Sequence, residues 1–129
     1  MNTLALCIDD DKISLLVMRM TLENSEQYNI VIENSNFDEG FDNFLEILKK
    51  DTSQIDVFIK SNYENSPGEL ENAFDFVERV TELKIEGNFN LYLVIGFIPE
   101  NYKVLDLLEQ WRLENKVKMV INFPFKWPL

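Results

Sequence analysis

The sequence contains no histidine, and this absence excludes several kinds of chemistry. Without an imidazole, the chain has no His-based catalytic triad, no histidine metal ligand and no histidine phosphotransfer group of its own. The single cysteine, Cys7, cannot form an internal disulfide. Its position inside an apolar run predicts a buried structural thiol.

Basic residues are also scarce. The chain has 12 Lys and Arg residues against 23 Asp and Glu residues, a formal net charge of −11, and its longest basic cluster is Lys49-Lys50. Such a chain is repelled by DNA, RNA and anionic lipid, so we expect no nucleic-acid partner and no membrane partner. It also lacks a twenty-residue apolar run and an export leader pattern, which predicts a cytoplasmic protein.

Glycine and proline are few, with four of each, while hydrophobic residues make up 46% of the chain. This composition is typical of a folded globule and not of a disordered segment. A length of 129 residues suits one domain with a single core, so residues 1–129 are predicted to form one domain with no separate output domain.

An apolar run at residues 4–8 ends in three consecutive acids, Asp9, Asp10 and Asp11. An unbroken apolar run is typical of a strand buried on both faces, and open α/β sheets bind ligands at the carboxyl ends of such strands. The three acids must face water, a metal or a cationic partner, because unpaired buried carboxylates are costly. One of them can instead cap the helix predicted to follow, since acids are favoured at a helix N-terminus.

The remaining chain alternates between strand and helix patterns. We predict further strands at 28–33, 55–59, 91–95 and 117–121, and helices at 12–24, 36–50, 66–80 and 99–115. This alternation favours an α/β fold with a parallel sheet and helices on both faces. The first helix carries two neighbouring apolar stripes; they consist of Ile13, Leu16, Val17 and Met20, and of Leu15, Met18 and Leu22. One stripe covers the sheet, and the other needs a second neighbour.

The segment from Leu6 to Asp11, followed by this alternation, resembles the receiver domain of two-component response regulators along essentially the whole chain. The resemblance implies a flavodoxin-like fold: a five-stranded parallel sheet in the order 2-1-3-4-5, flanked by helices. It also implies that Asp9 and Asp10 take the places of the acidic pair that holds Mg²⁺ in that family.

Other functional positions of the family differ in this chain. The family's phosphoacceptor aspartate ends strand three, where this chain has Ser61, or Lys60 with a shift of one residue. Ile95 or Gly96 replaces the Ser or Thr that ends strand four, and Phe123-Pro124 replaces the Lys-Pro pair after strand five. We therefore predict a degenerate receiver, or pseudo-receiver, that is not phosphorylated on aspartate. Asp9 and Asp10 alone would bind Mg²⁺ weakly at best, so no cofactor is expected.

Five residues follow Pro124, too few for the helix that ends a receiver domain, so that helix is predicted to be missing or truncated. We expect an uncovered groove beside the first helix, covered by a second copy or another protein. The residues predicted to contribute are Leu15, Met18, Leu22, Phe125, Trp127 and Leu129. Alternatively, the short tail folds back and fills the groove.

The resemblance implies a stand-alone, non-enzymatic signalling protein of the phosphorelay type that acts through protein contacts, and the uncovered groove predicts a homodimer. A histidine kinase or another signalling protein is the implied partner. One alternative is a small Mg²⁺-dependent phosphatase of the haloacid-dehalogenase type, because residues 8–13 approximate its opening motif. The later acidic pair of such enzymes is not evident. Another alternative is an interaction module unrelated to phosphorelay.

Overall fold

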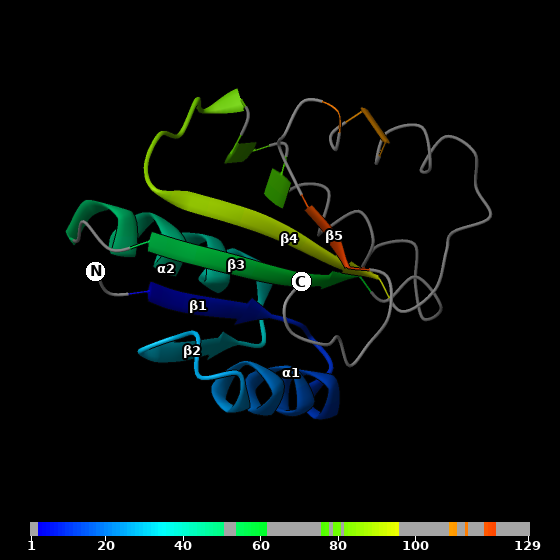
Figure 1. The fold of residues 1–129 in the computed structure, drawn as a ribbon. Helices are drawn as coiled ribbons and strands as arrows, with labels where there is room; N and C mark the ends of the chain where they lie inside the picture. The colour runs from blue at the N-terminus through cyan, green and yellow to red at the C-terminus, as the bar shows by residue number, and fades with distance from the viewer. Residues whose placement is uncertain are drawn as a thin grey trace.

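The computed structural model describes residues 3–50, 54–61, 76–77, 79–80, 82–95, 109–110, 113 and 118–120, and the statements below concern these residues (Figure 1). The elements are β1 (Thr3–Ile8), α1 (Lys12–Asn24), β2 (Ile30–Asn34), α2 (Phe37–Lys50), β3 (Gln54–Ser61), β4 (Phe89–Ile95) and β5 (Lys118–Val120). Residues 76–77, 79–80, 82, 109–110 and 113 are also helical. Among the described residues, no helix has the length and apolar character needed to cross a membrane.

All five strands pair in parallel, in the order β2-β1-β3-β4-β5 (Figure 1). The predicted fold class and strand order are therefore confirmed. β1 lies between β2 and β3, with Ile8 paired to Asn34 on one side and to Ile59 on the other. β3 extends two residues beyond its predicted end, so Lys60 and Ser61 belong to the strand.

Side chains of β1 alternate between the two faces of the sheet, as the pleat requires. Leu4, Leu6 and Ile8 pack into the core that contains α2, whereas Ala5 and Cys7 pack into the core that contains α1. Cys7 is a buried free thiol, as predicted, and burial raises its pKa. The apolar run of β1 is therefore unbroken because each face of the strand has a helix over it.

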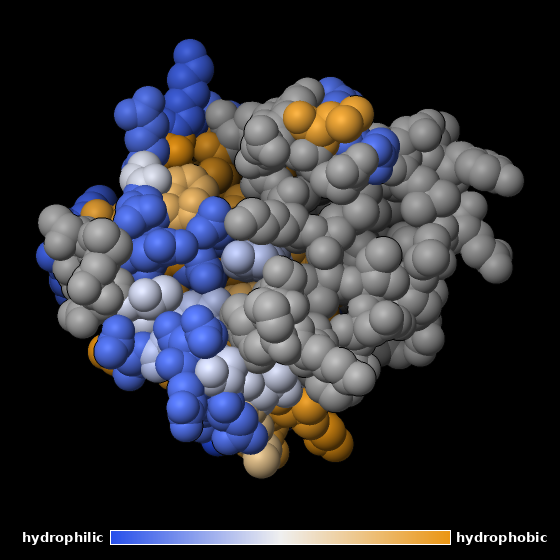
Figure 2. Space-filling view, in the orientation of Figure 1, coloured by the Kyte–Doolittle hydropathy of each residue, from blue (hydrophilic) through white to orange (hydrophobic). Residues whose placement is uncertain are grey.

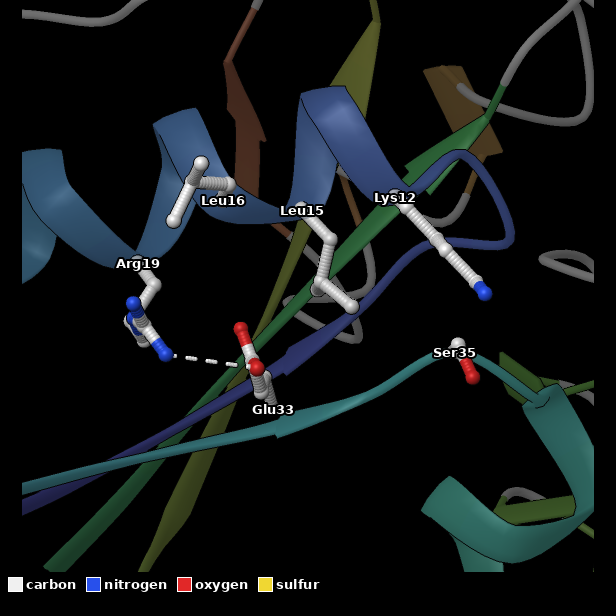
Figure 3. A pocket seen from close by; sticks show the side chains of 6 residues that line it. All are labelled: Lys12, Leu15, Leu16, Arg19, Glu33 and Ser35. Atoms are coloured by element: carbon white, nitrogen blue, oxygen red, sulfur yellow. Dashed lines mark hydrogen bonds and ion pairs between the residues drawn. The ribbon is translucent and has the colours of Figure 1, made fainter.

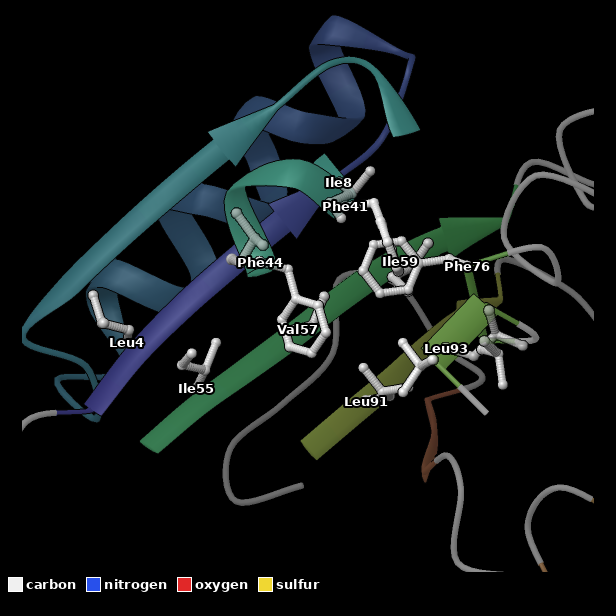
Figure 4. Close-up of a cluster of buried hydrophobic side chains, with 13 residues drawn as sticks. Leu4, Ile8, Phe41, Phe44, Ile55, Val57, Ile59, Phe76, Leu91 and Leu93 are labelled. Atoms are coloured by element: carbon white, nitrogen blue, oxygen red, sulfur yellow. The ribbon is translucent and has the colours of Figure 1, made fainter. Parts of the chain in front are cut away.

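The core on the α2 face is rich in phenylalanine (Figure 4). The ring of Phe44 lies 5.1 Å from that of Phe89 and 5.7 Å from that of Phe76, and Phe41 contacts Phe76 edge-on at 5.1 Å. The helix predicted at residues 36–50 is thus confirmed as α2. Asn36 caps it, because its Oδ1 accepts the backbone N–H groups of residues 38 and 39 at 2.8 and 3.1 Å.

One prediction about α1 is wrong. The stripe of Leu15, Met18 and Leu22 is buried against the sheet, so these residues do not face an uncovered groove. The two stripes lie on opposite sides of the helix, and the small Ala5 and Cys7 beneath α1 accommodate the leucine and methionine side chains. The other stripe is the one that faces solvent. The final helix and tail residues 121–129 lie outside the described residues.

Gly40 allows α2 to approach β1 closely. A Cβ atom at Gly40 would lie 2.6 Å from Cδ1 of Ile8, closer than real Cβ contacts come. We expect Gly40→Ala to lower the free energy of unfolding by about 1–3 kcal/mol through overpacking, although alanine gains up to ~1 kcal/mol in helix propensity. Chemical denaturation measures the difference.

A double variant distinguishes this clash from other effects. Ile8→Val removes Cδ1 and alone should cost about 0.5–1.5 kcal/mol. The double variant Ile8→Val, Gly40→Ala should lose less free energy of unfolding than the sum of the two single losses, because the two positions are in contact. Strict additivity would show that the Gly40 contact with Ile8 is not the cause.

Candidate functional site

Asp9 directly follows β1, at the end of the sheet where the family places its acidic pair. Its side chain is buried, and its Oδ1 accepts the backbone N–H of Asp11 at 2.9 Å. Its own backbone N–H donates to the carbonyl of Asn34 on β2 at 3.2 Å. Main chain and side chain therefore both hold Asp9 in the turn between β1 and α1.

Asp11 is the N-cap of α1, with extended backbone dihedrals of φ −88° and ψ 114°. Its Oδ1 accepts the backbone N–H groups of Ile13 at 2.9 Å and Ser14 at 3.2 Å. The alternative that one of the three acids caps this helix is confirmed for Asp11. Asp10, between them, is exposed to solvent. The three acids thus have different environments, which the sequence pattern did not distinguish.

Lys60 comes from β3, on the face of the sheet that α1 covers. Phe58 packs into the α1 core, and Lys60 is two residues further along the same strand, so the two side chains share a face. The Lys60 Nζ donates a hydrogen bond to the hydroxyl of Ser14, in the first turn of α1. The half-buried lysine therefore connects the end of β3 to the start of α1.

The same strand ends bring Lys60 close to the acidic turn. Ile8 pairs with Ile59, and Asp9 and Lys60 are the next residues of the two strands. The register therefore brings the backbone of Lys60 alongside that of Asp9, at one of the two positions that the sequence offered for the phosphoacceptor. Ser61, the other position, is in β3 and its backbone pairs with Ile95 of β4.

The remaining predicted positions are only partly described. Ile95 is the last residue of β4, while Gly96, Phe123 and Pro124 lie outside the described residues. The degenerate switch and lysine positions stay predictions. Within the described parts of the chain, no group of three or more His, Cys, Asp or Glu side chains could hold a metal ion. Weak Mg²⁺ binding by Asp9 and Asp10 also remains a prediction.

An open depression of about 450 Å³ lies between α1 and β2 (Figure 3). Its lining residues are Lys12, Leu15, Leu16, Arg19, Glu33 and Ser35. Arg19 Nη1 bridges it to Glu33 Oε1 at 3.3 Å. Sequence reasoning missed this feature. The available signal was the spacing of Lys12 and Arg19, seven residues apart and so on one side of a helix.

A buried carboxylate also lies at the opposite, amino-terminal edge of the sheet. Asp56 Oδ2 accepts the hydroxyl of Tyr28 at 2.7 Å, and its Oδ1 accepts the amide of Asn90 at 3.0 Å. Burial, and then this hydrogen bond, raise the pKa of Tyr28. The contacts connect β3 to β4 and to the segment before β2. They lie too far along the strands to join the acidic turn, so their role is structural.

Solved structures with a similar fold are known, whereas no family model and no curated protein sequence matches the chain. A response regulator receiver protein from Dyadobacter fermentans DSM 18053 superposes with a TM-score of 0.62 at 12% identity, over 98% of this chain and 90% of that one. The chain has the receiver fold. A CheY-like receiver domain protein from Methanospirillum hungatei JF-1 gives 0.60 at 16% identity, over 96% and 84%. At such identities the likeness concerns the fold alone.

Alanine substitutions distinguish the contributions of Asp10 and Asp11 to the stability of this fold. We expect Asp11→Ala to lower the free energy of unfolding by about 1 kcal/mol, because the N-cap hydrogen bonds of α1 are lost. Asp10→Ala removes the same charge from an exposed position and should change the free energy of unfolding by less than ~0.5 kcal/mol. Asp11→Asn should retain most of the stability. Equal losses at positions 10 and 11 would contradict the assignment of Asp11 as the cap.

Proposed function

We propose that this chain is a receiver-like signalling module that is not phosphorylated on aspartate and that signals through protein contacts. The observation that carries the proposal is Lys60, which lies beside the acidic turn and donates to Ser14. The function of response regulators requires a carboxylate at the end of β3, both as nucleophile and as metal ligand. An ammonium group can serve neither purpose.

The charge of Lys60 also bears on metal binding. A lysine ammonium has three donors and no acceptor, so it cannot coordinate Mg²⁺, an ion that prefers oxygen ligands in octahedral geometry. It also repels a second cation at short range. Burying Asp9 as a carboxylate is costly without positive charge or hydrogen bonds nearby; its Oδ1 accepts the backbone N–H of Asp11, and the strand register brings the Lys60 backbone alongside.

The module is proposed to work in the cytoplasm as a homodimer, with a histidine kinase or another signalling protein as its partner. The absence of histidine in the chain means that any phosphohistidine would have to belong to the partner. An interaction module without any link to phosphorelay has the same fold and the same site, and differs only in its partner.

Exposure to acetyl phosphate or beryllofluoride with Mg²⁺ tests this proposal. We expect no acid-labile adduct by intact mass and only small chemical-shift changes at Asp9 and Asp10, because β3 ends in Lys60 and Ser61, neither of which carries a carboxylate. A stoichiometric adduct on the wild-type chain would refute the proposal.

A matched pair of variants makes this negative result informative. Lys60→Asp replaces the ammonium with a carboxylate at the end of β3, on the face shared with Phe58, so its Mg²⁺-dependent shifts should exceed those of the wild type. Lys60→Asn has a side chain of the same shape without the charge, and should not gain this response.

The phosphatase alternative requires Asp9 as an accessible nucleophile. Asp9 is fully buried, and its Oδ1 already accepts the backbone N–H of Asp11, which favours a non-enzymatic role. We expect no Mg²⁺-dependent hydrolysis of p-nitrophenyl phosphate above the level of an Asp9→Asn preparation. Turnover that Asp9→Asn abolishes would instead identify an enzyme.

A further inference from the structure

We propose that the outward surface of α1 binds a second copy of this chain, with the two α1 helices antiparallel. This surface, the α1 face, consists of Ile13, Leu16, Val17 and Met20. The inference rests on the proposed function, in which protein contacts carry the signal, and it names the surface that makes one of these contacts.

The α1 face is apolar where a surface helix is normally polar. Ile13 is 76% exposed, Met20 is 50% exposed and Leu16 is 44% exposed. Spacings of three and four residues place them in one stripe, opposite the buried stripe that contains Met18. Apolar side chains are visible at the lower edge of the molecule, over α1 (Figure 2). A continuous exposed apolar stripe of this kind marks an interaction surface.

No other described element has a comparable stripe. The remaining large hydrophobic side chains that are exposed are Ile30, Leu83 and Leu113. They lie on separate segments of the chain, and isolated exposed hydrophobic residues are normal on protein surfaces. Among the described residues, the apolar contact surface is therefore concentrated on α1.

Charge favours a second copy at this surface. The charged residues of α1 are Lys12, Arg19 and Glu23, which give the helix a net charge of +1 within a chain of net charge −11. In contrast, α2 carries four acids and two bases. Two copies that approach through α1 therefore meet where their mutual repulsion is weakest.

The order of the charges in α1 selects the antiparallel arrangement. Lys12 begins the helix and Glu23 lies eleven residues later, which places both on the same side of it, about 16 Å apart. An antiparallel pair brings Lys12 of each copy to Glu23 of the other, with Leu16 near the centre, and it also pairs opposite ends of the helix dipoles. A parallel pair would place lysine against lysine.

The contact area predicts a weak dimer. Leu16 belongs both to the α1 face and to the depression beside β2, so the apolar surface continues beyond the helix (Figure 3). A 13-residue helix is nevertheless only about 20 Å long, and its face is smaller than the ~800 Å² per partner of standard interfaces. We expect a dissociation constant of ~0.1–1 mM.

Sedimentation of the full chain at concentrations up to about 1 mM tests the dimer, since this range spans the expected dissociation constant. The wild type should associate reversibly, and Met20→Glu should weaken association at least tenfold while leaving the circular dichroism spectrum unchanged. Leu83→Glu makes the same change in an exposed apolar residue away from α1 and should have no effect.

Charge exchange tests the arrangement. Lys12→Glu and Glu23→Lys should each weaken the dimer, and the double variant, which has the net charge of the wild type, should recover it. The Arg19–Glu23 ion pair within one copy, at 3.8 Å and partly exposed, contributes little. A monomeric wild type at every concentration, which would assign the α1 face to a different protein, overturns the proposal. A dimer that Met20→Glu does not weaken would also overturn it. So would a Lys12→Glu, Glu23→Lys double variant whose dimerisation is not restored.

These outcomes are separate from those of the proposed function. A monomer that forms no phosphoryl adduct refutes only the dimer. An adduct refutes the proposed function, whatever the state of association.

Discussion

The burial of β1 on both faces constrains the whole structure. β1 lies between β2 and β3 and under helices on both sides, so every side chain from Leu4 to Ile8 must be apolar. Charge can enter only where the strand ends, and there three acids follow at once. This is why the acidic turn lies at the carboxyl edge of the sheet, next to the end of β3.

At that edge, three side chains have described hydrogen bonds. Asp9 fixes the turn, Asp11 caps α1, and Lys60 connects β3 to Ser14. The Lys60 contact joins β3 to α1, whereas the Asp9 and Asp11 contacts are local to the turn and the first turn of α1.

Helix α1 illustrates how one element can satisfy the core and still carry an apolar surface. Its inner stripe packs over Ala5 and Cys7, whose small side chains leave room for leucine and methionine. Its outer stripe is not needed by the fold. Exposing the apolar outer side of such a helix to water is unfavourable in free energy, and burying it against a second surface is favourable.

The sequence alone was sufficient to predict the α/β class, the helix at 36–50 and the buried Cys7, because each follows from local periodicity or from the burial of a continuous strand. The strand order was implied by the resemblance to receiver domains. The sequence also offered Lys60 and Ser61 as alternatives at the end of β3. Tertiary structure was needed to show that Lys60 reaches Ser14, that Asp11 is the capping acid, and which stripe of α1 faces the sheet. These outcomes depend on strand register and on the rotation of a helix about its axis. Residues distant in sequence determine both, so a local pattern does not contain them.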